Sequence, residues 1–142
     1  MNFKYYNLLI LSVFSFLLLL SSDLKATHVA GANFEFECLG NNQYRVKLNV
    51  FRDCSGAGMP TAASLNRTTQ TWISSPCGTI SFNWTRDSVT EVSQLCPAQL
   101  NQSRCNNGSL PGMQHGHFTA IVTIPPCASG FHELNFSLCC RN

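Results

Sequence analysis

Eight cysteines behind an apolar leader limit what this chain can fold into. All of them follow the run "LLILSVFSFLLLL" at residues 8–20, which is shorter than the roughly 20 apolar residues of a membrane-spanning helix. Such a run is typical of a signal peptide, and Ala26 is a suitable last residue before cleavage. An uncleaved anchor helix is the alternative, because Leu24 is not ideal for a signal peptidase. We expect a signal peptide at residues 1–26 and one exported domain at residues 27–142.

An even number of cysteines in an exported domain predicts a disulfide framework. Zinc ligation is the alternative, but the chain lacks the C-x2-C pairs that structural zinc sites usually show. The short polar loop "CPAQLNQSRC" favours a Cys96–Cys105 bridge, and the positions of strand ends favour a second bridge from Cys54 to Cys139 or Cys140. The cysteines expected in disulfides are Cys38, Cys54, Cys77, Cys96, Cys105, Cys127, Cys139 and Cys140.

The charge of the expected mature domain is close to neutral. The chain has nine Lys and Arg residues and seven acidic ones. Lys4, Lys25 and Asp23 precede the expected cleavage point, so seven basic and six acidic residues remain after it. This balance gives no electrostatic reason to bind nucleic acid or an anionic membrane. We therefore expect no nucleic-acid partner and, after signal cleavage, no membrane span.

Alternation of apolar and polar residues predicts antiparallel strands with one buried face. It is strictest in "QYRVKLNVFRDC", and "NFEFEC" shows it too. Between these runs lies "LGNNQ", whose Gly and Asn residues tolerate the positive φ of a tight turn. A first hairpin is thus predicted over residues 33–54. The apolar side chains expected to share one face of its second strand are Tyr44, Val46, Leu48 and Val50.

Further strands are predicted in "TQTWIS", "GTISFNWT", "HFTAIVTIPP" and "FHELNFSLCC". Residues 55–64 contain Gly and Pro and are expected to form a loop, and residues 98–109 are polar. Six or seven short strands favour an all-β fold, an immunoglobulin-like antiparallel β-sandwich stapled by disulfides. A closed barrel is the alternative.

The sequence offers little for catalysis. It contains no G-x-S-x-G, H-E-x-x-H or glycine-rich phosphate-binding motif. Glu35 and Glu37 could form an acid–base pair, but they alternate with phenylalanines on an expected solvated strand face. We predict that the chain is not an enzyme. We assign it no catalytic residue, cofactor or metal ligand.

Binding is the class of function that the residues leave open. His115 and His117 in "HGH" could place two imidazoles on one side of an extended segment and bind a metal, although a solvated loop is the simpler interpretation. Trp72 could be exposed and stack on a sugar or a partner. Trp84 is expected in the core, because it shares a face with Ile80 and other apolar residues.

The order of several short motifs resembles a known family. "ATHVAGANFEFECLGNNQYRVKLNVFRDCSG", "EVSQLCP", "RCNNGSLPG", "TIPPC" and "SLCCRN" are similar, in this order, to the N-terminal region of large secreted and cell-surface proteins of Bacteroidetes. The likeness covers residues 27–142. Phe51 stands where that family usually has tyrosine, and Ala32 stands where a second glycine is common.

The resemblance implies a place and a class of function. Such proteins often carry PKD or immunoglobulin-like repeats and a gliding-motility-associated signal for type IX secretion. It implies a non-catalytic, adhesin-like module of a secreted or cell-surface protein, with surface glycans or other extracellular proteins as partners. In that family "CCRN" lies inside the chain, so the expectation is a truncated protein. The alternative is a small free-standing exported domain that binds a ligand or a metal, and that is periplasmic if the chain is complete.

Overall fold

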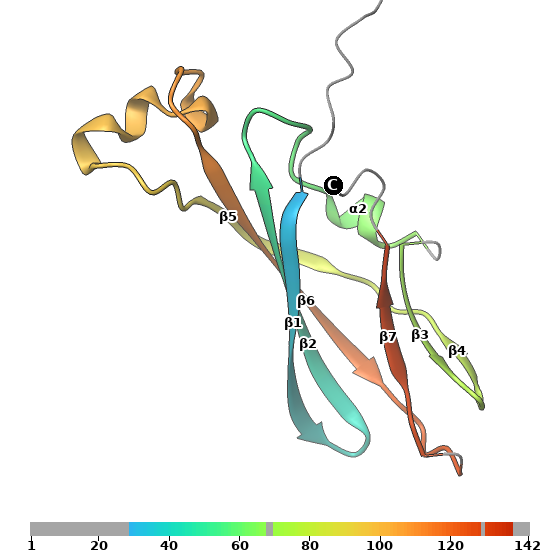
Figure 1. The fold of residues 1–142 in the computed structure, drawn as a ribbon. Coiled ribbons are helices and arrows are strands. Elements are labelled where there is room, and N and C mark those ends of the chain that lie inside the picture. The colour runs from blue at the N-terminus through green and yellow to red at the C-terminus, as the bar shows by residue number, and fades with distance from the viewer. Residues whose placement is uncertain (1–28, 68–69, 129, 138–142) are drawn as a thin grey trace, which may run out of the picture.

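The computed structural model describes residues 29–67, 70–128 and 130–137, in which seven strands form two antiparallel sheets (Figure 1). The predicted signal peptide at residues 1–26 lies outside these ranges. The four-stranded sheet has the order β1 (Val29–Gly40), β2 (Gln43–Asp53), β6 (Met113–Thr123) and β5 (Thr85–Glu91). The three-stranded sheet has the order β4 (Gly78–Ile80), β3 (Thr71–Ser75) and β7 (Glu133–Phe136).

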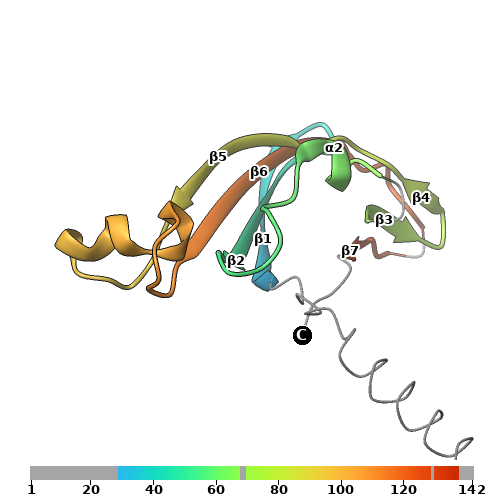
Figure 2. The same ribbon diagram turned by 90° about the horizontal axis from the view of Figure 1, so that it is seen from above.

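The two sheets pack into a sandwich, which confirms the predicted all-β class. Figure 2 shows the large sheet as an arch with β3 and β7 beneath it. The core between them contains the buried side chains of Val46, Leu48, Val50, Leu65, Ile73, Trp84, Phe118, Ala120 and Val122. Removal of such apolar surface from water is the main stabilising contribution to folding. No helix in the described part of the chain is long and apolar enough to cross a membrane.

The predicted first hairpin is confirmed. β1 and β2 pair from Val29↔Arg52 to Gly40↔Gln43. At the turn, Asn41 and Asn42 have φ values of 51° and 59°. Positive φ at both central residues is the type I′ turn, whose twist matches that of the flanking strands.

Trp84 lies in the segment that connects β4 of one sheet to β5 of the other, and it is in the core as predicted. Its side chain is 2% exposed, and its indole Nε1–H donates to Thr71 Oγ1 at 2.9 Å. The Thr71 hydroxyl donates in turn to the carbonyl of Leu65 at 2.7 Å. The Trp84 amide donates to Asn66 Oδ1 at 2.6 Å. The polar groups around the indole are thus satisfied inside the core.

Two local expectations were wrong. The strand predicted in "GTISFNWT" ends at Ile80, and β5 begins only at Thr85. β5 was missed because nearly all of its side chains are exposed, so it has no apolar alternation. In the loop predicted at residues 55–64, a short helix α2 (Ala62–Leu65) begins, which Thr61 and Ser64 stabilise through a capping box.

Residues 92–112, called the arm below, connect β5 to β6 and project from one end of the large sheet (Figure 1). The arm contains two 3-10 helices, η1 (Pro97–Gln102) and η2 (Arg104–Asn106). Ser103 between them is fully buried. Its amide donates to the carbonyl of Leu100 at 3.1 Å, and its carbonyl accepts from the Gly108 amide at 2.8 Å. The predicted polar region therefore forms two short helices that backbone hydrogen bonds hold together.

Both predicted disulfide pairings were wrong. Cys105 bonds to Cys54, with 5.0 Å between the Cα atoms. The reason is tertiary: the Cys54 amide donates to the carbonyl of Gly112 at 2.9 Å, so the end of β2 lies beside the base of the arm. A Cβ on Gly112 would lie 2.7 Å from Cys105 Sγ, so only glycine fits beside this bridge. Cys105 is therefore bonded to the end of β2 and not to Cys96 within the arm, and this disulfide ties the arm to the large sheet.

The second disulfide, Cys77–Cys127, joins the β3–β4 turn to the loop after β6. Two of the other cysteines expected in bridges, Cys38 and Cys96, are exposed and form no disulfide with a described residue. The remaining two, Cys139 and Cys140, lie outside the described residues. The disulfide framework is thus confirmed for four of the eight cysteines.

Candidate functional site

The large sheet has an outer face that the three-stranded sheet does not cover. The side chains there come from alternate positions of β1, β2 and β6 and from the edge strand β5. Its members are Glu35, Glu37, Arg45, Lys47, Asn49, Phe51, Asp87, His115, His117 and Thr119. These residues share the face because neighbouring side chains in a strand point to opposite sides. Glu35 and Glu37 thus lie on the exposed strand face predicted for them.

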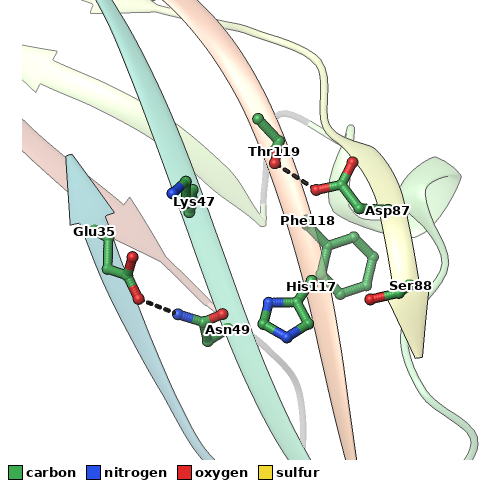
Figure 3. A pocket seen from close by; sticks show the side chains of 8 residues that line it. All are labelled: Glu35, Lys47, Asn49, Asp87, Ser88, His117, Phe118 and Thr119. Carbon is green, nitrogen blue, oxygen red and sulfur yellow. Dashed lines mark hydrogen bonds between the residues drawn. The ribbon is translucent and has the colours of Figure 1, made fainter. Parts of the chain in front are cut away.

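A cleft of about 290 Å³, lined mainly by polar residues, lies on the outer face (Figure 3). Glu35 on β1 and Asp87 on β5 line it from its two sides, with His117 between them. The other lining residues are Lys47, Asn49, Ser88, Phe118 and Thr119. Two carboxylates, one ammonium group and one imidazole therefore face a common space.

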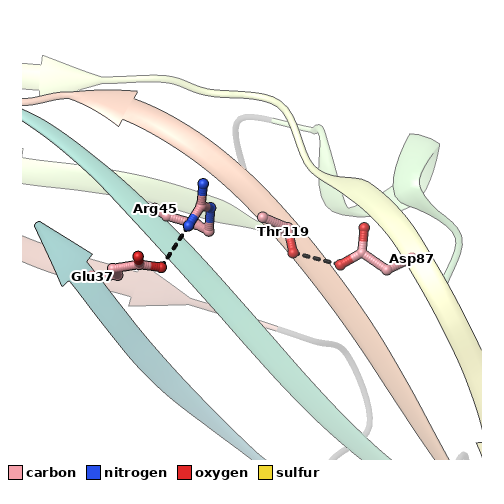
Figure 4. A network of polar contacts seen from close by, with 4 residues as sticks. All are labelled: Glu37, Arg45, Asp87 and Thr119. Carbon is pink, nitrogen blue, oxygen red and sulfur yellow. Dashed lines mark hydrogen bonds and ion pairs between the residues drawn. The ribbon is translucent and has the colours of Figure 1, made fainter. Parts of the chain in front are cut away.

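One ion pair and several hydrogen bonds hold charged side chains of this face (Figure 4). Arg45 Nη1 donates to Glu37 Oε2 at 2.6 Å, across the β1–β2 pair. The Thr119 hydroxyl donates to Asp87 Oδ2. An exposed ion pair of this kind contributes about 0–1 kcal/mol to stability. These bonds fix side-chain orientation on the face more than they stabilise the fold.

His115 and His117 lie within β6, not in the solvated loop that the simpler interpretation expected. Their ring centroids are 3.8 Å apart, with 50° between the ring planes. Phe51, directly opposite His115 on β2, stacks on that ring at 4.3 Å and 12°. Burial lowers the pKa of His115, the neighbouring His117 lowers it further, and Glu35 partly opposes both effects. The surroundings of His115 therefore favour the neutral form of its ring.

A series of hydrogen bonds runs across three strands, from Glu35 through Asn49 to His115. Asn49 Nδ2 donates to Glu35 Oε1 at 2.9 Å. On its other side, Asn49 Oδ1 lies 3.2 Å from His115 Nε2. The Asn49 side chain is 5% exposed. No pattern in the sequence predicts this series of hydrogen bonds, because only the strand register brings residues 35, 49 and 115 together.

An apolar groove of about 590 Å³ continues from Phe51 towards the arm. Phe51, Val92, Leu95 and Met113 give it its apolar character, and Asp53, Ser93, Gln94, Pro111 and Gly112 also line it. The outer face thus changes from charged at the cleft to aromatic at the histidines and apolar at the arm. Trp72, the other binding candidate, is only partly exposed and lies on β3 in the other sheet.

Comparison with protein-family models, with curated proteins and with solved structures gives no match. The family resemblance of the sequence motifs therefore remains a prediction. No three His, Cys, Asp or Glu side chains within residues 29–67, 70–128 and 130–137 form a metal-binding cluster. What the structure adds is one face on which a cleft, a histidine pair and a groove follow one another.

Proposed function

We propose that this chain is a non-catalytic module of a secreted or cell-surface, adhesin-like protein, and that its outer face is the contact surface. The observation that carries the proposal is the continuous series of cleft, histidine pair and groove on one face of the large sheet. Surface glycans and extracellular proteins are the partners that such a mixture of polar, aromatic and apolar groups suits. The motif resemblance adds gliding motility and type IX secretion as its setting.

The disulfides support an extracellular setting for the module. Cys54–Cys105 and Cys77–Cys127 close loops with sequence separations of 51 and 50 residues. Bridges that close long loops mainly restrict the unfolded chain, and they persist in oxidising compartments. A domain stapled in this way retains its contact face outside the cell, where reducing systems and chaperones are absent.

The test is binding of the oxidised, fluorescently labelled full chain to intact producer cells and to their isolated extracellular polysaccharide. We expect saturable binding that the variant Lys47→Glu weakens at least tenfold, because Lys47 lines the cleft. Arg67→Glu, an equal charge change at an exposed position near α2, is the matched control and should bind like the natural chain.

Three outcomes would contradict the proposal: no saturable binding, equal loss with both variants, or binding that Lys47→Glu leaves unchanged. Circular dichroism of each variant separates loss of binding from loss of fold. Delivery is tested separately, by comparing the amount of the protein in the medium and on the cell surface of strains with and without a working type IX secretion system. Unchanged amounts would remove type IX secretion from the proposal and leave the binding result standing.

A further inference from the structure

The chain of bonds from Glu35 sets which nitrogen of His115 carries a proton. An ionised carboxylate only accepts hydrogen bonds, so Asn49 must turn its NH2 group to Glu35 Oε1. Its carbonyl oxygen then faces His115 Nε2. An amide oxygen also only accepts, so Nε2 of His115 must be the protonated nitrogen. In the neutral form of the ring, the free lone pair is therefore on Nδ1.

This arrangement is the one that metal-binding histidines need. A histidine that ligates a metal with one nitrogen usually donates its other N–H to a carbonyl or carboxylate, which fixes the tautomer and the ring orientation. Here Asn49 takes the place of that acceptor, and Glu35 holds Asn49 in turn. His115 thus has the hydrogen-bond acceptor that would orient its ring for metal ligation.

His117 supplies a second imidazole on the same side of the strand. It lies two residues from His115 on β6, and the two ring centroids are 3.8 Å apart. No hydrogen bond to a described side chain holds this ring, and it is partly exposed. Rings bound to one ion at metal–nitrogen distances of about 2.0–2.1 Å have centroids roughly 5 Å apart. The two rings are closer together than that, so binding requires the His117 ring, which no described side chain holds, to turn away from His115.

The charge of the cleft favours a cation beside His117. Glu35 and Asp87 contribute carboxylates from the two sides, and Lys47 is the one ammonium group among the residues that line the cleft. Asp87 accepts a hydrogen bond from the Thr119 hydroxyl through Oδ2, which leaves Oδ1 for a contact with a cation. Glu35 on the edge strand β1 and Asp87 on the edge strand β5 would thus line the space beside an ion held by the two histidines (Figure 3).

We propose that His115 and His117 bind a divalent transition-metal ion, Zn²⁺ or Cu²⁺, with His115 ligating through Nδ1. Imidazole ligands suit both ions, and Cu²⁺ binds a given set of nitrogen and oxygen ligands more tightly than Zn²⁺. Two protein ligands leave coordination positions open to water or to a group of a partner. The site is therefore an open one, unlike the closed four-ligand sites that hold structural zinc. It adds an activity to the proposed contact surface and does not depend on it.

The experiment is a titration with Zn²⁺ and Cu²⁺ of the oxidised full chain that carries Cys38→Ser and Cys96→Ser, so that these two exposed thiols cannot bind the metal. Imidazole ¹⁵N NMR should show His115 with its proton on Nε2 before Zn²⁺ is added. Zn²⁺ should then shift the His115 and His117 resonances together. Calorimetry should give tighter binding for Cu²⁺ than for Zn²⁺.

Variants decide whether these two rings form the site. His115→Ala and His117→Ala should each weaken Zn²⁺ binding at least tenfold, and Glu35→Gln should weaken it by up to about tenfold by releasing Asn49. His132→Ala, a partly buried histidine outside the outer face, is the matched control and should bind normally. His115→Gln and His117→Gln replace the alanine variants if circular dichroism shows that those do not fold.

Four results would overturn the proposal. They are the absence of Zn²⁺ and Cu²⁺ binding, binding that survives the loss of both histidines, an equal loss in His132→Ala, and a His115 ring protonated on Nδ1 instead of Nε2. None of them bears on cell-surface contact, because that function is tested through Lys47. A chain that binds cells but no metal would keep the proposed function and lose this site.

Discussion

The core of the sandwich and the arm at its end are stabilised by different interactions. In the core, apolar side chains such as Leu48 and Phe118 are fully buried between the sheets. The arm, residues 92–112, has no buried apolar side chain; Ser103 and Gly112 are its buried residues. It is held instead by the Cys54–Cys105 disulfide and by bonds such as the one from Asn106 Nδ2 to Glu91 Oε2 at 2.8 Å. Burial thus decides the fold, while covalent and polar contacts place the arm.

The largest effect is expected in the core. Phe118→Ala removes a fully buried ring that lies opposite Leu48 in the β2–β6 pair, and should lower the free energy of unfolding by about 3–5 kcal/mol. Thr119→Ala, the next residue on the outer face, is the control and should cost less than about 1 kcal/mol. Guanidinium unfolding under oxidising conditions measures both. Similar losses in the two variants would contradict the assignment of the inner face as the core.

A smaller effect is expected when the arm is released. Replacing Cys54 and Cys105 together with serine should lower stability by about 2–4 kcal/mol. Hydrogen exchange should show amides of the arm, such as that of Arg104, losing protection before the β2 amides do. The Cys77→Ser/Cys127→Ser pair is the control, because it removes a bridge at the other sheet and should leave the arm protected. Simultaneous loss of protection in arm and core would show that the two regions unfold as one unit.

The smallest effect is a pH dependence confined to the arm. Hydrogen bonds from Ser103, Ser93 and Asn106 lower the pKa of Glu91 below its ordinary value of 4.5, against an opposing effect of burial. The folded state thus prefers the ionised carboxylate. The resulting stabilisation is present above about pH 4.5 and is lost as the pH falls through the lowered pKa.

The variant Glu91→Gln isolates this dependence. At neutral pH we expect its arm to be cut faster by a protease than the natural arm. The difference between the two chains should disappear at low pH, because protonated Glu91 then resembles glutamine in charge. His115 titrates in both chains and so does not affect the comparison. A difference that persists unchanged at low pH would mean that the Glu91 carboxylate does not act through its charge.

The sequence alone determined the class of fold. The alternation in "QYRVKLNVFRDC" selects Val46, Leu48 and Val50 for the core because side-chain direction along a strand is a local property. The same is true of the hairpin, whose Asn41 and Asn42 accept the positive φ of its turn. The two imidazoles of "HGH" were also placed on one side of an extended segment from local geometry, and their position in β6 agrees with that.

Only the tertiary structure decided which distant residues meet. The sequence paired Cys105 with its near neighbour Cys96, whereas the packing of β2 against the base of the arm brings Cys54 to it. The strand register likewise sets Asn49 between Glu35 and His115. Sequence spacing carries no information on register, because every antiparallel pairing that keeps the apolar face inwards satisfies the same alternation. The candidate site was therefore half visible in the sequence, as two histidines without the residues that orient them.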